Sequence, residues 1–254
     1  MSLLKVNKVR KEFGGVVALR NVDFEVNEGE ILGIIGPNGA GKTTIFNCIT
    51  GVYDLTDGTI SLGENDLGSF NIHQIVKEGI SRTFQNIRLF DGMTVIENLV
   101  VGMHTELKSN VIQSLFHTKK EKEEERKAYV RANELLKLVG LEASGHLPAT
   151  SLSYGEKRRL EIARAMAAEP KILLLDEPAA GMNDSESKEL KELINQINKK
   201  YNITIVVIEH DMNLMMNVCD RMVVLNFGEK IAEGRPKEIQ NNPAVIEAYL
   251  GEDN

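Results

Sequence analysis

The residues best suited to chemistry form a glycine-rich loop near the start of the chain. Residues 36–43 read GPNGAGKT and fit the pattern G-x-x-x-x-G-K-[ST] at every position. The glycines allow successive backbone N–H groups to turn toward one anion, a conformation that a Cβ atom would obstruct. Lys42 adds a charge for the β- and γ-phosphates of a nucleotide, and the Thr43 hydroxyl can ligate Mg²⁺. The loop therefore predicts a site for a nucleotide with Mg²⁺.

The sequence on either side of this loop predicts a strand before it and a helix after it. Residues 30–35 are a short apolar run that suits a buried strand, and residues 44–49 have a helical pattern that ends at Gly51. This order places the phosphates at a helix N-terminus, where the dipole and free N–H groups favour negative charge. A glycine-rich turn that matched the pattern by chance would not be expected in this context.

Two carboxylates follow a second apolar run, residues 171–175. Such a run is typical of a central parallel strand whose C-terminal end faces a ligand crevice. Asp176 is expected to hold the Mg²⁺ shell through water, and Glu177 to orient and polarise the attacking water. The alternative is a strand that simply ends in surface acids, and the phosphate loop upstream argues against it.

A third buried strand is predicted at residues 203–208, and Glu209, His210 and Asp211 follow it directly. A single histidine is usually structural. His210, however, lies at the edge where parallel strands place ligands, so we favour a functional role. The other core elements expected are a helix at 185–199, a strand at 221–225 and an amphipathic helix at 243–250.

The N-terminal part of the chain has the pattern of short antiparallel strands. Residues 3–30 alternate apolar and polar positions, and residues 57–62 begin at an Asp-Gly turn. We expect these strands to form a small antiparallel sheet beside the nucleotide. Phe13, just before two glycines, is a candidate for stacking on adenine, and a half-buried strand aromatic fits the local pattern equally well.

The pattern becomes helical from Thr94 onward. Thr94 with Glu97 and Ser153 with Glu156 have the spacing of capping boxes. Residues 119–127 carry opposite charges four positions apart, which indicates a solvated helix face and not a binding tract. Taken alone, the Ser153 segment indicates only the start of a helix.

Composition narrows the class of protein. The chain has 254 residues, 42% of them hydrophobic, and a formal net charge of −7, which argues against a dedicated nucleic-acid binder. No apolar run approaches the ~20 residues needed to span a bilayer, and no signal peptide is expected, so a membrane role would require a partner. Cys48 and Cys219 are expected to be reduced, buried residues of a cytosolic protein.

Five motifs in order resemble the nucleotide-binding domain of ABC transporters, and the likeness covers nearly the whole chain. They are residues 36–43, Gln85, residues 152–156, Asp176 with Glu177, and His210. The resemblance implies an α/β fold: a phosphate-loop NTPase core with a mainly parallel sheet, a flanking antiparallel β-subdomain and an inserted α-helical subdomain. It implies one domain over 1–254, with the core at about 1–88 and 166–254 and the helical subdomain at about 89–165.

The same resemblance implies a role for each matching residue. The implied catalytic residues are Glu177 as base, His210 as the switch histidine on the γ-phosphate, Gln85 and Lys42. The implied ATP-binding residues are Phe13, Gly36, Pro37, Asn38, Gly39, Ala40, Gly41, Lys42, Thr43 and Thr44, joined by Ser153 and Gly155 from the opposite subunit. The implied Mg²⁺ ligands are Thr43, Gln85 and Asp176, the last through water.

The chain departs from the usual family pattern at three positions. The signature loop most often reads L-S-G-G-Q, whereas Tyr154 and Glu156 stand here at the third and fifth positions. Ser153 and Gly155, the pair that the family uses to bind phosphate, are kept. Asn183 stands where the family commonly has aspartate, and its amide oxygen can still accept a hydrogen bond.

Three tracts narrow the resemblance further. Residues 177–183, 208–212 and 242–251 look like those of the ATP-binding subunit of bacterial or archaeal branched-chain amino acid importers. The long insert at about 108–127 is similar to that of the larger of the two ATPase types in such systems.

The expected function is thus an ATPase that powers solute import. Its implied partners are transmembrane permeases, a second ATPase subunit in a head-to-tail, ATP-dependent dimer and, indirectly, a solute-binding protein, with no nucleic acid. Its implied location is the cytoplasm, on the inner face of the cell membrane. The alternatives are an ABC transporter for another solute, a soluble ABC ATPase acting on nucleic acid or the ribosome, and a small-molecule kinase, which should lack the signature loop and His210.

Overall fold

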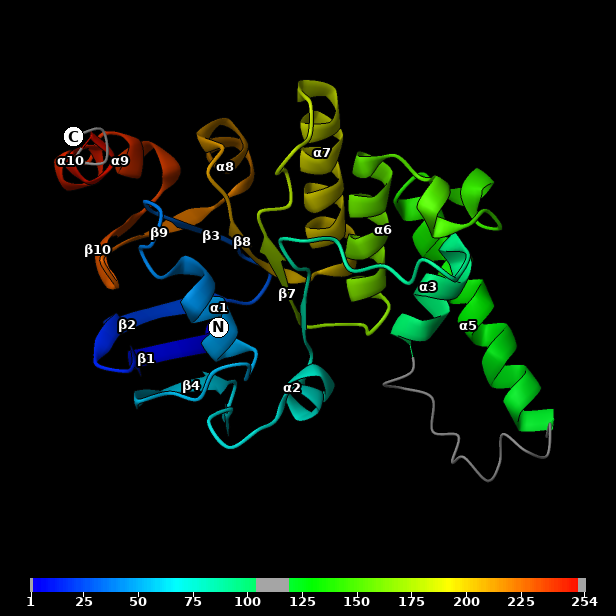
Figure 1. The fold of residues 1–254 in the computed structure, drawn as a ribbon, viewed down its shortest axis with the longest axis horizontal. Helices are drawn as coiled ribbons and strands as arrows, with labels where there is room; N and C mark the ends of the chain where they lie inside the picture. The colour runs from blue at the N-terminus through cyan, green and yellow to red at the C-terminus, as the bar shows by residue number, and fades with distance from the viewer. Residues whose placement is uncertain (1, 104–118, 251–254) are drawn as a thin grey trace. The chain divides into compact units, whose positions relative to one another are not determined.

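The computed structural model of the protein describes residues 2–103 and 119–250 (Figure 1). The chain forms two compact units, and each is described by itself. The core unit comprises Met1–Gln85 and Lys171–Asn254, and the helical unit comprises Asn86–Pro170. Most of the expected insert, residues 108–118, lies outside the described residues.

The centre of the core unit is a six-stranded sheet with the strand order β10-β9-β3-β8-β7-β6. Its strands are β3 (Ile31–Ile35), β6 (Ile80–Arg82), β7 (Ile172–Asp176), β8 (Thr204–Ile208), β9 (Arg221–Asn226) and β10 (Glu229–Gly234). All neighbours pair in parallel except β9 and β10. Every residue of β3, β7 and β8 is buried, as their apolar sequences predict for strands covered on both faces. Parallel pairing brings the C-terminal ends of these three strands to one edge.

A second, four-stranded sheet confirms the expected antiparallel strands. Its order is β2-β1-β4-β5, with β1 (Ser2–Phe13), β2 (Val16–Asn27), β4 (Asp57–Leu62) and β5 (Asn65–Asp66). Val22, Phe24 and Val26 alternate with exposed residues along β2 and join a hydrophobic cluster that also contains Phe46 and Leu174. The core therefore lies between the two sheets and α1 (Lys42–Ile49).

Helices cover both faces of the six-stranded sheet. Figure 1 shows α1 and the antiparallel sheet on one side, with α8 (Met212–Val218), α9 (Pro236–Gln240) and α10 (Pro243–Leu250) on the other. At Gly33 of β3, a Cβ atom would lie 2.5 Å from the Met215 side chain of α8 and 2.9 Å from that of Cys219, so a larger residue would force these side chains to shift. The remaining helices are α2 (Ile72–Glu78) and α7 (Asp184–Tyr201).

The start of α7 explains one departure from the family pattern. Asn183 is its N-cap: the side-chain oxygen accepts the Glu186 N–H at 3.0 Å, and the Glu186 carboxylate accepts the Asn183 N–H. An amide oxygen caps a helix about as well as a carboxylate does. The observed helix extends the expected range of 185–199 by one residue at its start and two at its end.

The described part of the helical unit contains α3 (Val95–Gly102), α5 (Lys119–Leu138) and α6 (Tyr154–Met166), with short 3₁₀ turns at Glu142–Ser144 and Ala149–Ser151. Both expected capping boxes are present, at Thr94 and Ser153. The expected charge pairing on α5 is present between Glu123 and Lys127 at 3.2 Å. Within the described residues, no helix has the length and apolar character that crossing a bilayer would require.

Candidate nucleotide-binding site

The phosphate loop connects β3 to α1, and its backbone requires glycine. Gly36 has φ 147° and Gly41 φ 101°. A Cβ atom at Gly36 would lie 2.0 Å from the Leu225 carbonyl oxygen, so the adjacent strand β9 leaves no room for a side chain. The loop thus adopts, in this chain, the left-handed conformations that its sequence predicts.

Lys42 is buried within this loop. Its ammonium group donates hydrogen bonds to the carbonyl oxygens of Gly36 at 2.6 Å and Pro37 at 2.8 Å. The charge is therefore held inside the curve of the loop, at the N-terminus of α1. The loop offers an anion a cation and a helix dipole in the same place.

A cavity of about 180 Å³ lies over the loop and joins parts of the chain that are far apart in sequence. It is lined by Ala18, residues 38–44, Glu177 and His210. The C-terminal ends of β7 and β8 supply the last two residues, as expected from parallel strands. The structure thus brings together the phosphate loop, the candidate base and the candidate switch histidine.

Glu177 is the centre of a hydrogen-bonded set. Its Oε2 accepts a hydrogen bond from Gln85 Nε2 at 2.7 Å, and its Oε1 lies 2.7 Å from His210 Nε2. The Glu177 backbone has φ 46°, a left-handed conformation that is rare outside glycine, and its N–H donates to the Ile208 carbonyl oxygen. Strained backbone of this kind persists where surrounding contacts hold it, and it concentrates at functional sites.

One such contact comes from Glu209, which the sequence interpretation gave no role. This buried carboxylate accepts the Ala179 N–H at 2.5 Å and the His210 N–H at 3.0 Å. Burial raises the pKa of the Glu209 carboxyl above its ordinary value, and backbone N–H groups of Ala179, His210 and Asp211 oppose that rise. Glu209 therefore ties the loop after Glu177 to the segment that carries His210. An acid directly at the end of an apolar strand was the available signal.

Asp176, the last residue of β7, is buried, and one of its two carboxylate oxygens is hydrogen-bonded. Its Oδ2 accepts a hydrogen bond from Arg82 Nη2 at 2.7 Å, whereas Oδ1 has no hydrogen-bond partner among the residues described. A buried carboxylate oxygen without a partner is the hard, anionic ligand that Mg²⁺ prefers. Thr43 at the start of α1 adds a hydroxyl and Gln85 an amide oxygen, so the donor set fits Mg²⁺.

Phe13 lies at the end of β1 on the antiparallel sheet and is exposed. Its ring makes an edge-to-face contact with Tyr53 at a centroid distance of 5.0 Å, and the Lys11 ammonium lies 4.8 Å from its centroid. These contacts hold the ring on the surface of the sheet. An exposed, oriented aromatic ring can stack on a base, as the sequence interpretation expects.

The signature loop begins α6 of the helical unit. The Ser153 hydroxyl accepts the Glu156 N–H at 3.3 Å, and the Glu156 carboxylate accepts the Ser153 N–H at 2.8 Å. Glu156 therefore completes the cap, and the hydrogen bond from the Ser153 backbone lowers its pKa. Tyr154 is 45% exposed, and Gly155 is buried. Both sequence departures in this loop are compatible with a well-formed helix N-terminus.

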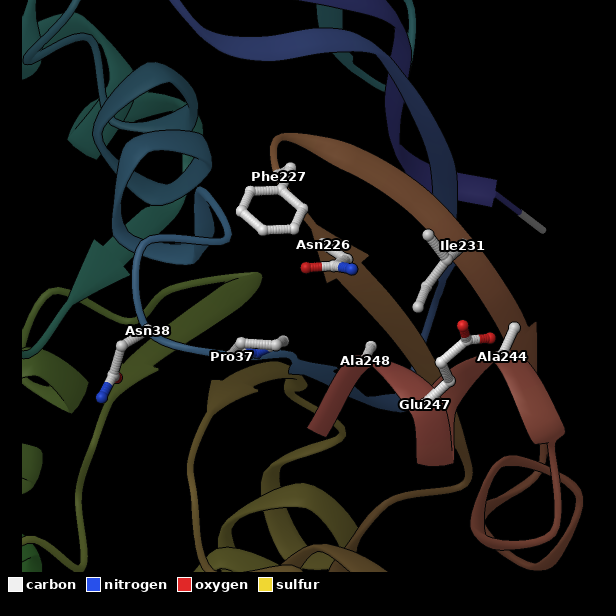
Figure 2. Close-up of a pocket in the computed structure, with 8 residues that line it drawn as sticks. All are labelled: Pro37, Asn38, Asn226, Phe227, Ile231, Ala244, Glu247 and Ala248. Carbon is white, nitrogen blue, oxygen red and sulfur yellow. The ribbon is translucent and has the colours of Figure 1, made fainter. Parts of the chain in front are cut away.

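A second cavity, of about 450 Å³, lies beside the phosphate loop (Figure 2). Pro37 and Asn38 of the loop, the β9–β10 turn and α10 line it, and Asn38 also lines the first cavity. Phe227 in the turn is 82% exposed and has φ 45°. The sequence interpretation singled out neither this turn nor the cavity.

Comparison with known proteins places the chain among ATP-binding cassettes. The family model described as "ABC transporter" matches residues 19–180, and that described as "Branched-chain amino acid ATP-binding cassette transporter" matches residues 229–254. The chain is 50% identical over 250 residues to the high-affinity branched-chain amino acid transport ATP-binding protein LivG of Salmonella typhimurium, with 98% of each chain covered.

Solved structures of ATP-binding cassettes are also similar to this chain. The ADP conformation of MJ1267, an ATP-binding cassette of an ABC transporter, has a TM-score of 0.86 at 33% identity and covers 99% of each chain. A dimeric, post-hydrolysis state of the cassette MJ0796 bound to ADP and Pi has a TM-score of 0.77 at 27% identity, with 92% of this chain and 99% of that chain covered. These matches confirm the family resemblance and the α/β phosphate-loop fold. The chain belongs to the ABC transporter family, as an ATPase of its ATP-binding cassette type.

Proposed function

We propose that this chain hydrolyses ATP to power solute import through partner permeases, and that the solute is a branched-chain or other hydrophobic amino acid. The observation that carries the proposal is the likeness to LivG, a branched-chain amino acid transport protein, along 98% of both chains. The match at residues 229–254 to a branched-chain amino acid cassette model supports the same solute class.

The site supports a division of labour among its residues. The backbone of residues 36–44 and the Lys42 ammonium bind the phosphates of ATP, and Phe13 stacks on adenine. Thr43, Gln85 and, through water, Asp176 would hold Mg²⁺, and the bound ion would supply positive charge beside the phosphates. Catalysis then rests mainly on positioning and electrostatic stabilisation, because phosphoryl transfer demands little covalent chemistry from the protein.

Glu177 is the base in this proposal. Its two carboxylate oxygens are engaged by Gln85 and His210 in the structure described here. A base must accept a hydrogen bond from the attacking water, so binding of ATP has to exchange one of these contacts for that water. His210 is suited to the exchange, because its Nε2 can turn from Glu177 to the γ-phosphate. In this proposal the nucleotide binds first, and the base becomes available afterwards.

The signature loop of one subunit acts on the ATP that the other subunit binds. We infer a head-to-tail dimer in which Ser153 and Gly155 of one chain hold the γ-phosphate bound by the other, whether the second ATPase is identical or a paralogue. The dimeric MJ0796 cassette supports the arrangement, and a capped helix start offers N–H groups and a favourable dipole to the phosphate. In this view residues 1–254 act as one domain, with the core at about 1–88 and 166–254 and the helical subdomain at about 89–165.

Permeases would hold the protein on the cytoplasmic face of the membrane, and a solute-binding protein would act through them. The test is reconstitution in vesicles with two candidate permeases, the binding protein and, in a parallel sample, a paralogous ATPase, with uptake of labelled leucine and of a labelled charged amino acid as control. We expect leucine uptake that requires ATP and disappears with Glu177→Gln. ATP hydrolysis without uptake of any hydrophobic amino acid would contradict the solute class. The absence of hydrolysis would contradict the ATPase role.

A further inference from the structure

Arg82 belongs to no motif named above, yet it forms a buried ion pair with Asp176. Arg82 ends β6, its Nη2 lies 2.7 Å from Asp176 Oδ2, and the two side chains are only 6% and 3% exposed. A buried pair of this kind is weak evidence for stability, because desolvation offsets most of the attraction. Its position beside the metal-binding edge of the sheet suggests another purpose.

The same guanidinium also holds α1. Its Nη1 donates to Asn47 Oδ1 at 2.7 Å and to Thr50 Oγ1 at 3.3 Å, at the C-terminal end of the helix whose first turn contains Thr43. The guanidinium carbon lies 5.4 Å from the ring centroid of Phe46 and 5.4 Å from that of Phe84. Contacts with both η nitrogens and two rings fix the guanidinium in one orientation.

These contacts join two elements that carry expected Mg²⁺ ligands, α1 and β7, to β6, which directly precedes the third. Thr43 lies in α1, Asp176 ends β7, and Gln85 follows Arg82 by three residues. We propose that Arg82 is a positioning residue for the magnesium site: it occupies Asp176 Oδ2, leaves Oδ1 for the metal shell and clamps α1, β6 and β7 together. This inference rests on the proposed function, because it assumes the magnesium site of an ATPase.

The geometry requires arginine and not merely a positive charge. Asp176 Oδ2 and the two acceptors on α1 are reached from different nitrogens of one planar group. A lysine ammonium is a point charge on a flexible stem, so it can compensate Asp176 without fixing the direction of Oδ1 or the position of α1. Arg82→Lys is therefore the informative variant, because it keeps the positive charge and loses the planar group that donates from two nitrogens.

The experiment measures metal binding apart from turnover. Mn²⁺ binding to the full-length protein is followed by electron paramagnetic resonance with ADP present, and ADP binding is measured by calorimetry in EDTA. For Arg82→Lys we expect Mn²⁺ affinity to fall by about tenfold while ADP affinity in EDTA stays within about twofold, as for outer-shell groups that orient metal ligands. The matched control is Arg221→Lys, because Arg221 also pairs with carboxylates in the core unit, at the start of β9. It should leave both affinities unchanged.

Wild-type Mn²⁺ affinity in Arg82→Lys, or an equal loss of Mn²⁺ and ADP affinity, would overturn the inference while leaving the ATPase proposal intact. A wild-type protein whose nucleotide binding does not respond to divalent metal would contradict the magnesium site and this inference with it. If Arg82→Lys fails to fold, Asn47→Ala removes only the shorter of the two hydrogen bonds to α1 and keeps the pair with Asp176. That variant should weaken Mn²⁺ binding by a smaller factor, and an unchanged affinity would contradict the clamp.

Discussion

The candidate nucleotide site and the signature loop are both proposed to bind phosphate, but different contacts hold them. At the edge of the six-stranded sheet, Arg82 and Asp176 are 94 residues apart in sequence, and Gln85 and Glu177 are 92 apart. At the start of α6, the capping box joins Ser153 and Glu156, three residues apart. The first region depends on the whole core unit, and the second depends on one helical turn.

This difference matters for how each region can fail. Long-range hydrogen bonds between buried groups transmit small displacements to the reacting atoms, because a close-packed core has few voids that could absorb them. A local cap keeps its geometry whenever the helix forms, so its loss should lower stability modestly and should affect activity only when a partner subunit must use the loop. Variants in the two regions should therefore separate hydrolysis, dimerisation and stability.

The largest effect is expected for Glu177→Gln. The amide keeps the shape and the contact with Gln85 but cannot take a proton from water, so phosphate release should fall by at least about 100-fold. ATP binding should persist, and size-exclusion chromatography with ATP should show a trapped dimer. Hydrolysis at the wild-type rate would show that Glu177 is not the base, and the sheet edge would then not be the site of catalysis.

Glu209→Gln should have the next largest effect. The amide nitrogen of the new glutamine would place a donor against a backbone N–H group that the Glu209 carboxylate now accepts, and this would loosen the loop after Glu177. We expect kcat to fall by roughly 10- to 100-fold, with KM for ATP little changed. Asp220→Asn is the matched control, because Asp220 accepts the Ile31 N–H in the same unit but lies outside the site. An equal fall in kcat for both variants would assign Glu209 a purely structural role.

Ser153→Ala should act on the dimer and not on nucleotide binding by the single chain. Loss of the cap costs about 1 kcal/mol of stability, and loss of a hydroxyl toward a charged phosphate weakens ATP-dependent dimerisation by about tenfold. Analytical ultracentrifugation in the Glu177→Gln background measures the second quantity. If ATP binding to the monomer fell as much as dimerisation, the signature loop would not be acting in trans.

The smallest effect on activity is expected for Tyr154→Cys, which tests whether position 154 is exposed to solvent while the two native cysteines are buried. Burial raises the pKa of Cys48 to about 11 and of Cys219 to about 12, so at pH 8 both thiols stay protonated and react slowly with iodoacetamide. A thiol at the exposed position 154 should react quickly, and ATP should protect it in the Glu177→Gln dimer. Fast labelling of the native cysteines in the folded protein would contradict their burial.

Much of the site was predictable because its residues are consecutive or follow recognisable strands. The pattern of residues 36–43 implies the loop, and a carboxylate or histidine after a buried apolar run implies the sheet edge. The chain order of five motifs predicted the family, which the comparisons confirm. Two of the sequence departures have a local reason that a capping rule can supply: Glu156 completes one box, and Asn183 begins another.

The sequence by itself determined the phosphate loop, the buried parallel strands and the capped helices, because each depends on residue types within a few positions of one another. Only the tertiary structure decided that Arg82 compensates Asp176 and that Glu209 holds the loop of Glu177. Whether a charged side chain is buried, and which distant group it meets, depends on strand order and register. Nothing in the chain on either side of Arg82 distinguishes it from a surface arginine, so its role emerges only when β6, β7 and α1 meet.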